Sequence, residues 1–219
     1  MKLINFDNFE NCFLKIKNIP EYSLTNNIIL TLNKFLINIL FLILPISLLI
    51  FSKSRAQTNL QEIKMEKINL TSSSFKDGEL IPSTYTCDGK NISPALSWDK
   101  PSDAIKRFAI IAEDPDSPGG TFIHWVIYNI PSNIKGFPED ITPIKNIPDE
   151  VLLGTNSFGH IGYGGPCPPS GTHRYIFKIY GLSNVVHLEA GAEKGELMRA
   201  MQKYIIAEGE LMGKYQRQN

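Results

Sequence analysis

The side chains best suited to chemistry gather between residues 114 and 180. Two histidines, His124 and His173, each stand near the start of a run rich in β-branched and aromatic residues. Gly- and Pro-rich segments lie close to both runs, so each imidazole could sit where a strand meets a loop. A single strand histidine is most simply a hydrogen-bonded core residue. Two of them, with hydroxyl and backbone N–H groups from nearby loops, favour a small anion site.

Asp114 is the acidic residue of this group. A bare carboxylate would repel an anion, but beside a histidine it would raise the pKa of that imidazole and fix its tautomer. We therefore expect anion affinity to rise as the pH falls from about 8 to about 6. Asp116, within Asp-Pro-Asp-Ser-Pro-Gly-Gly, is interpreted as a turn former. Arg174 should face away from His173 and is interpreted as an ion-pair or loop-pinning residue.

Strands must position these side chains. Runs of β-forming residues at 108–113, 122–130 and 173–182 are separated by Asp-Gly, Ser-Pro and Pro-Gly-Gly turn signals. Apolar residues at three-to-four spacing predict one helix over 192–203, and a final strand is expected at 210–215. This pattern indicates an all-β-dominated, antiparallel two-sheet β-sandwich or barrel with a C-terminal helix, rather than alternating βα units.

Alternation assigns the strand side chains to faces, because every second residue of a strand points the same way. Each histidine should therefore share a face with the apolar residues that follow it. The two sets are His173, Tyr175, Phe177 and Ile179 in one strand, and Phe122, His124, Val126, Tyr128 and Ile130 in the other. If the two strands are neighbours, the imidazoles meet at one end of the sandwich, at the mouth of a small pocket.

Composition excludes several classes of protein. The 219 residues carry 22 basic and 22 acidic side chains, so the chain lacks the basic excess typical of nucleic-acid binding. Its 42% hydrophobic content is that of a globular protein. The three cysteines form no CxxC pair, and no HExxH motif occurs, so neither a metal nor another cofactor is expected.

The N-terminal part is a different kind of segment. The run 35–51 contains no charge and is apolar on all sides, and its length lies between a signal-peptide core and a membrane span of about 20 residues. Ser54-Arg55-Ala56 just downstream would be acceptable to signal peptidase. We expect residues 1–56 to form a signal peptide or membrane anchor with an N-terminal extension, built on an apolar leader helix.

Two explanations fit the unusually long segment before this run. It could come from a start codon chosen too far upstream, or it could be a genuine cytoplasmic extension ahead of an uncleaved anchor. Residues 57–64 are expected to be a linker and residues 65–219 a single domain. The expected location is the cell envelope: periplasmic or secreted if the leader is cleaved, and membrane-anchored otherwise. Contact with the membrane is expected only through the N-terminal segment.

Several motifs together resemble a known family. Asp114-Pro115-Asp116-Ser117-Pro118, His124-Trp125 and the run GGPCPPSGTHRY at 164–175 are similar to the phosphatidylethanolamine-binding protein family. The resemblance is to its bacterial and archaeal branch, often labelled Raf kinase inhibitor-like. The segments 91–98 and 208–217 fit the same branch, so the resemblance covers essentially all of residues 65–217.

The resemblance implies an anion pocket at one end of two antiparallel sheets, accepting phosphate, phosphoryl head groups or small carboxylates. The matching motifs assign ligand-binding roles to Asp114, His124, His173, Tyr175, Pro168 and Pro169. The resemblance also implies a cis peptide bond before Pro118. It brings Cys87 and Cys167 toward the pocket end, where an exported protein would favour a disulfide and a cytosolic one free thiols.

These inferences point to a non-enzymatic binding protein with a small anionic ligand, able to regulate or inhibit a partner protein. The alternative is a protease or kinase inhibitor that acts by protein–protein contact. A hydrolase using Cys167 or Ser170 with His173 and Asp114 is less well supported, because the sequence contains no G-x-S-x-G motif.

Overall fold

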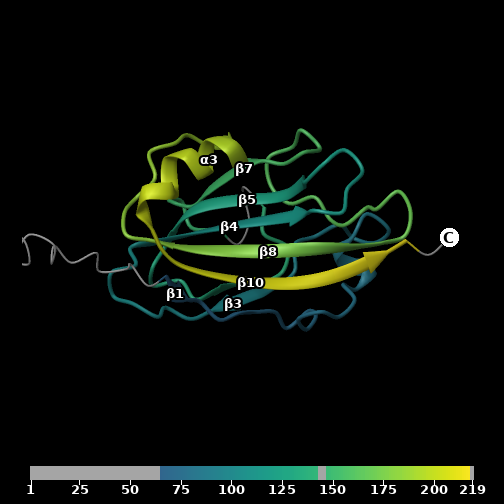
Figure 1. Cartoon of the computed structure of the whole chain (residues 1–219), viewed down its shortest axis with the longest axis horizontal. Helices are drawn as coiled ribbons and strands as arrows, with labels where there is room; N and C mark the ends of the chain where they lie inside the picture. The colour runs from purple at the N-terminus through teal and green to yellow at the C-terminus, as the bar shows by residue number, and fades with distance from the viewer. Residues whose placement is uncertain (1–64, 143–146, 218–219) are drawn as a thin grey trace, which may run out of the picture. The chain divides into compact units, whose positions relative to one another are not determined.

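The computed structural model describes residues 65–142 and 147–217, which form two β-sheets and one α-helix (Figure 1). The expected leader at 1–56 and the expected linker at 57–64 lie outside the described residues. Within the described part, no helix combines the length and apolar character needed to cross a bilayer.

The larger sheet has seven strands in the order β1-β10-β8-β4-β5-β7-β9. Their bounds are β1 Glu66–Lys67, β4 Arg107–Asp114, β5 Phe122–Pro131, β7 Leu152–Thr155, β8 Thr172–Leu182, β9 Gly191–Glu193 and β10 Ile205–Gln216. The pairings β1–β10 and β7–β9 are parallel and the others are antiparallel.

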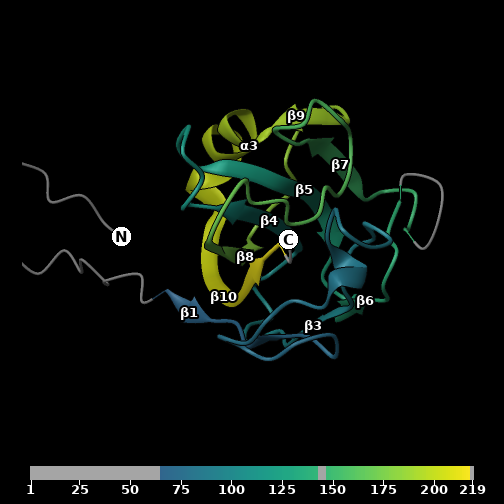
Figure 2. The same ribbon diagram turned by 90° about the vertical axis from the view of Figure 1, so that its right-hand side faces the viewer.

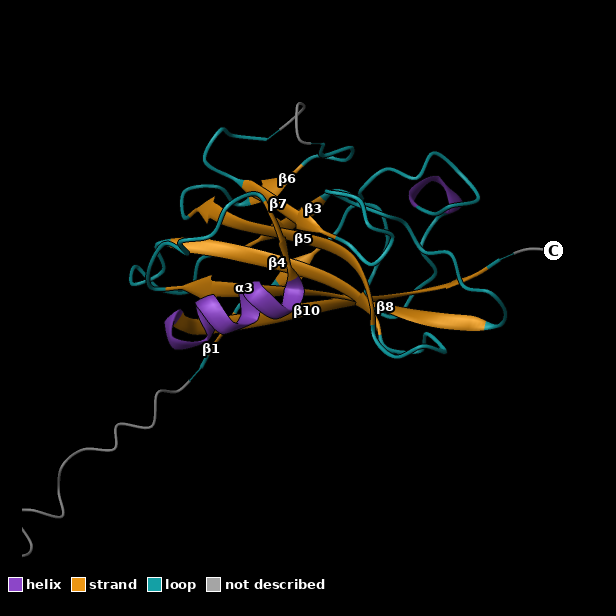
Figure 3. Cartoon of the chain, turned by 90° about the horizontal axis from the view of Figure 1, so that it is seen from above, coloured by secondary structure: helices purple, strands orange, loops and turns teal. Residues whose placement is uncertain are grey.

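The smaller sheet has three strands in the order β2-β3-β6, all antiparallel. They are β2 Leu70–Thr71, β3 Leu96–Trp98 and β6 Gly136–Phe137, and a 3₁₀ turn, η3 Ser83–Tyr85, lies between β2 and β3 in the chain. The smaller sheet lies on one side of the larger sheet and helix α3, Lys194–Met201, on the other (Figures 2 and 3). The predicted two-sheet, strand-dominated architecture with a C-terminal helix is confirmed.

The helix begins two residues later than predicted. Gly191–Glu193 pairs with β7 as strand β9, and Glu193 then caps the helix. The Glu193 side chain accepts from the backbone of Glu196, and the Glu196 side chain accepts from the backbone N–H of Glu193, which forms a capping box. After the 3₁₀ turn η4, Gln202–Tyr204, strand β10 starts well before the expected residue 210.

Two apolar layers hold these elements together. Between the sheets, Trp98 packs edge-on against Phe108 and Phe137, with ring centroids 5.9 and 5.5 Å apart. Between the larger sheet and α3, the second layer is built from Ile111, Val126, Tyr128, Leu197 and Met201 among others. A strand buried on both faces shows little alternation of polarity, which explains the nearly unbroken apolar runs of β4 and β5.

Two β-bulges break the alternation of β5, so the predicted shared face is wrong for this strand. Ala112 pairs with Trp125 but Glu113 pairs with Ile123, which leaves His124 as an extra residue. His124 and Trp125 therefore both face the inter-sheet layer, while Val126 and Tyr128 face the helix. A second bulge at Asn129, with φ 57°, returns Ile130 to the inter-sheet layer.

A buried carboxylate ties α3 to the sheet. Glu113 is 5% exposed, and its two oxygens accept hydrogen bonds from Lys178 of β8, at 2.6 Å, and from Lys194 of α3. Burial opposes ionisation of Glu113, but the two lysines outweigh it and lower the pKa of this carboxyl below its ordinary value of 4.5. The ionised acid therefore stabilises the folded state.

Glu113→Gln should lower the free energy of unfolding by about 2 kcal/mol near neutral pH, because charge-assisted hydrogen bonds are lost. A carboxyl whose pKa is lowered in the folded state stabilises at pH values above its unfolded pKa, and this contribution is lost as the pH falls through the folded pKa. Urea unfolding at several pH values measures the difference, which should shrink in acid. The exposed Glu210→Gln serves as the control; equal effects of both substitutions would contradict the role of Glu113.

Candidate functional site

Three adjacent strands bring the predicted site residues to one end of the larger sheet. In the sheet order, β4 lies between β5 and β8, so the strands that carry His124 and His173 are not direct neighbours. β4 ends between them at Asp114, at the end to which its arrow points in Figure 1. Strands two places apart are separated by about 10 Å, so the two histidines start from backbone positions on either side of the middle strand.

His173 is oriented by Asp114. Its Nδ1 lies 2.7 Å from Oδ2 of Asp114, and the two side chains are only 9% and 5% exposed. The other carboxylate oxygen, Oδ1, accepts a hydrogen bond from the backbone N–H of Asp116 at 2.8 Å. Because a carboxylate accepts and Nδ1 donates, the ring turns its Nε2 away from Asp114.

His124 is oriented by a backbone carbonyl instead of an acid. Its Nδ1 donates to the carbonyl oxygen of Gly164 at 2.7 Å, and the N–H of Gly164 donates to the carbonyl of His124 at 2.8 Å. Burial lowers the pKa of His124 below 6.5, although Gly164 and the charge of Asp114 act in the opposite direction. The neutral ring therefore presents the lone pair of its Nε2.

The Tyr175 hydroxyl is the third polar group of the cluster. Tyr175 is 1% exposed, its ring packs edge-on against His124 at 5.1 Å, and its hydroxyl makes no hydrogen bond among the described residues. Burial and the charge of Asp114 raise the pKa of Tyr175, while the Cys167 backbone lowers it by a smaller amount. The hydroxyl thus remains a proton donor, and an unsatisfied buried donor is costly unless a ligand engages it.

Two phenylalanine rings complete the surroundings of His124. Phe122 and Phe158 lie 5.2 and 5.6 Å from the imidazole and 4.7 Å from each other, and Phe158 is 43% exposed. Neither ring was predicted from the sequence to belong to the site. The sequence shows only that Phe158 lies in the Gly-rich segment before Gly164. Because the direction of a side chain in such a loop cannot be predicted from sequence, this position did not indicate a contact with His124.

The loop that carries Gly164 is fixed to the segment at 85–91. The Tyr163 hydroxyl donates to the carbonyl of Tyr85 at 2.8 Å, and the N–H of Gly165 donates to the side chain of Asn91 at 2.7 Å. A disulfide joins Cys87 to Cys167 with their Cα atoms 5.4 Å apart. These links determine where the Gly164 carbonyl lies and hence how His124 is held.

Asp116, in the turn after β4, forms an ion pair with Arg174. Asp116 accepts two hydrogen bonds from the Arg174 guanidinium, at 2.9 and 2.7 Å, and a third from its backbone N–H. Arg174 holds the pKa of Asp116 at about 2. Asp116 thus lies in the turn and Arg174 forms an ion pair, as predicted for each, beside the His173–Asp114 contact.

The cis peptide expected before Pro118 is absent from the described residues, so that prediction is wrong. The N–H of Gly120 donates to the carbonyl of Ser117 at 3.0 Å, which makes Pro118 the second residue of an ordinary β-turn. That position requires only the φ angle that proline already has, with a trans bond before it. Of the predicted wall residues, Pro168 is buried and Pro169 is exposed; both follow Cys167 directly.

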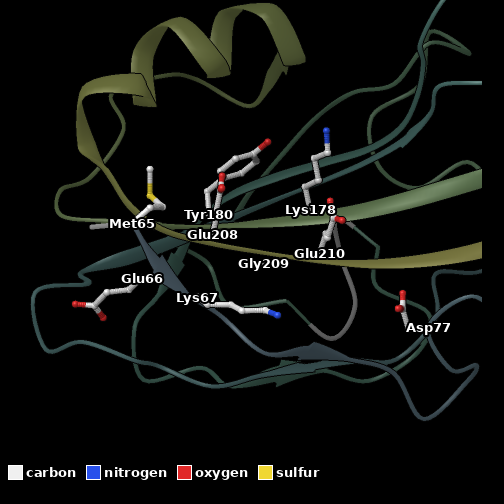
Figure 4. A pocket seen from close by; sticks show the side chains of 9 residues that line it. All are labelled: Met65, Glu66, Lys67, Asp77, Lys178, Tyr180, Glu208, Gly209 and Glu210. Carbon is white, nitrogen blue, oxygen red and sulfur yellow. The ribbon is translucent and has the colours of Figure 1, made fainter. Parts of the chain in front are cut away.

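A separate groove of about 670 Å³ lies elsewhere, along β1, β8 and β10 (Figure 4). It contains none of the predicted site residues. Four acids and two lysines line it, and one of these lysines, Lys178, lies directly opposite Glu210 in the strand register and is already bound to Glu113. Because acids outnumber lysines in its lining, this groove does not favour an anion.

The cluster of His124, Asp114, His173 and Tyr175 groups two imidazoles, a carboxylate and a hydroxyl at one end of the larger sheet. Within the described ranges, the Tyr175 hydroxyl has no hydrogen bond of good geometry, although the Cys167 backbone lies close enough to lower its pKa. No group of three or more His, Cys, Asp or Glu residues that could hold a metal occurs in the same ranges. The arrangement is therefore suited to hydrogen-bonded recognition.

The tautomer and the pKa of His124 can be measured directly. Nitrogen-15 NMR should show His124 as the Nδ1–H tautomer with a pKa below the ordinary value of 6.5, because burial disfavours the imidazolium. A histidine whose pKa is lowered contributes stability that is complete above its unfolded pKa and is lost as the pH falls through its folded pKa. Spectra of His124→Gln assign the signal; an Nε2–H tautomer would contradict the contact with Gly164.

Comparisons with known proteins agree with the fold. The model of the phosphatidylethanolamine-binding protein family matches residues 71–216. A UPF0098 protein of Methanothermobacter thermautotrophicus is 46% identical over 150 residues, which are 68% of this chain and 99% of the relative. A UPF0098 protein of Aquifex aeolicus is 44% identical and covers 67% of this chain and 86% of its own.

Two solved structures extend the likeness to three dimensions. A homologue of phosphatidylethanolamine-binding proteins from Chlamydia trachomatis is 38% identical with a TM-score of 0.64, covering 70% of this chain and 99% of its own. YbcL of E. coli, described as a member of the mammalian family, is 30% identical with a TM-score of 0.65, covering 69% and 99%. Because the family model and these relatives match the same domain, the chain belongs to the phosphatidylethanolamine-binding protein family.

Proposed function

We propose that this protein is a non-enzymatic binding protein that takes a small anionic group, such as phosphate, a phosphoryl head group or a carboxylate, at the cluster of His124, Asp114, His173 and Tyr175. One observation carries the proposal: the Tyr175 hydroxyl is buried without a hydrogen-bond partner, its ring packs against His124, and the Nδ1 atoms of His124 and His173 are already used. Membership of the family supports a role in binding.

The contacts of Cys167 and Ser170, the two candidate nucleophiles, do not support the hydrolase alternative. Cys167 is bonded to Cys87 and has no thiolate to offer. Ser170 is exposed, and in the described ranges no hydrogen bond joins it to His173. A Ser–His or Cys–His pair needs its base within hydrogen-bond reach of the nucleophile.

Regulation of a partner protein is part of the same proposal. An acidic or phosphorylated side chain of a protease, kinase or other partner would present the same anionic group to the cluster as a free ligand does. A pull-down from an extract of the native host, with and without competing inorganic phosphate, compares the two modes. Partner binding that phosphate abolishes supports recognition through the cluster.

Substitution of the donors should weaken anion binding. His173→Gln and Tyr175→Phe should each raise the Kd for inorganic phosphate about tenfold, because each removes a hydrogen bond to a charged group. Calorimetry in a phosphate-free buffer at about pH 6 measures the change. The exposed His187→Gln is the matched control and should bind like the parent. Equal Kd values for all four proteins would refute the assignment of the site.

We also propose that the domain works outside the cytoplasm, as an exported or membrane-anchored protein. The Cys87–Cys167 disulfide supports this location, because disulfides persist in oxidising compartments. The uncharged run at 35–51 supports it independently.

Protein recovered from the native host tests the location. The expected result is an N-terminus near residue 57 or an intact chain in the membrane fraction, with Cys87 and Cys167 resistant to alkylation until a reductant is added. N-terminal sequencing and mass spectrometry after alkylation measure both properties. A full-length chain in the cytosol with two free thiols would contradict the proposed location.

A further inference from the structure

The sequence contains two acceptor motifs for N-linked glycans. Such a motif has the form Asn-x-Ser/Thr, with any residue except proline in the middle. The two are Asn69-Leu70-Thr71 and Asn91-Ile92-Ser93. A glycan is bulky and hydrophilic, so its asparagine has to lie on the surface of an exported protein. The surroundings of each motif therefore decide whether it can be used.

The segment that carries Asn69 presents its polar side chains to solvent. It runs from β1 of the larger sheet to β2 of the smaller sheet. Ile68 and Leu70 are buried in the inter-sheet layer, with exposed fractions of 1% and 5%. Because successive residues of an extended chain point to opposite sides, Asn69 and Thr71 point outward together, and both are exposed. The amide and the hydroxyl of this motif thus lie on one accessible side.

The Asn69 side-chain amide is not used by the fold. The backbone N–H of Asn69 donates to the side chain of Asp99 at 2.9 Å, but within the described ranges its side-chain amide makes no hydrogen bond. The Thr71 hydroxyl makes a single contact, in which it donates to the Ser97 carbonyl at 3.2 Å. A sugar attached to Asn69 would therefore displace no hydrogen bond of the folded domain.

The second motif, in contrast, is part of the folded structure. The Asn91 side chain accepts a hydrogen bond from the N–H of Gly165 at 2.7 Å. Ser93 is 1% exposed, and its hydroxyl accepts from the N–H of Ile141 at 2.9 Å. Because the hydroxyl of this motif is buried, a transferase has no access to it in the folded domain. The structure thus distinguishes two motifs that are equivalent in the sequence.

We propose that Asn69 carries an N-linked glycan and that Asn91 does not. The co-substrate is a lipid-linked oligosaccharide. Nδ2 of Asn69 forms a bond to the first sugar carbon, and the bond from this carbon to the lipid phosphate oxygen breaks. Its electron pair leaves with the phosphate, and one amide proton passes to a base of the transferase. The inference goes beyond the ligand site and rests on the proposed location outside the cytoplasm.

Peptide mass spectrometry of the protein recovered from the native host tests the inference. Trypsin cleaves after Lys67 and Lys76, which isolates Asn69 in the peptide 68–76. We expect this peptide to be heavier than its sequence by the mass of one or more sugars, and fragmentation to place the added mass on Asn69. The tryptic peptide that begins at Asn91 should have the mass of its sequence.

Two substitutions at Thr71, expressed in the native host, separate the motif from the fold. Thr71→Val keeps the size of the side chain but removes the hydroxyl, so the added mass should disappear. Thr71→Ser keeps the hydroxyl, so the added mass should remain. Urea unfolding confirms that both variants fold. Added mass that Thr71→Val leaves unchanged, or that fragmentation places on the hydroxyls of residues 71–74, would overturn the inference.

The state of the cysteines in the same sample separates this inference from the proposed location. A Cys87–Cys167 disulfide together with an unmodified Asn69 would overturn the inference and leave the location in place. Free thiols together with an unmodified Asn69 would overturn both. A glycan on Asn91 with Asn69 unmodified would overturn the inference alone. Added mass on Asn69 that Thr71→Val abolishes supports both.

Discussion

The hydrogen bond between Asp114 and His173 is the contact on which the candidate site depends. It joins the end of β4 to the start of β8, buries an acid beside an imidazole and decides which ring nitrogen faces outward. Because Asp114 also accepts from the backbone of Asp116, the same carboxylate fixes the turn that Arg174 holds from the other side. The proposed recognition site and the turn structure thus share Asp114.

Basic side chains near the cluster and on the helix-side face of the sheet are paired with acids. Lys178 and Lys194 bind Glu113, Arg174 binds Asp116, and at the C-terminal end Arg217 binds Asp88. Under the proposed function, the cluster would therefore recognise a ligand by the direction of its donors and acceptors. Such a site depends on exact orientation, which is why backbone carbonyls, a disulfide and edge-on rings surround it.

Much of the fold followed from the sequence, because its strong signals are local. Strands β4, β5 and β8 and helix α3 were predicted to within a few residues from apolar runs and turn residues. The short strands β1, β2, β3, β6, β7 and β9 were missed because two to four residues have no readable period. The site residues were predicted from motifs. The position of β4 between β5 and β8, the contact of the Gly164 carbonyl with His124 and the contact of Phe158 with His124 could not be predicted, because they depend on long-range pairing that periodicity does not encode.

The bulge at His124 has an evolutionary consequence. As the extra residue of β5, His124 adds an imidazole to the inter-sheet side while Trp125 keeps its place in the core. Removal of this one codon would restore a regular ladder and leave the pairing of the later part of the strand in register. Descendants of such a gene could therefore lose ligand recognition in a single mutational event and keep the scaffold for another purpose.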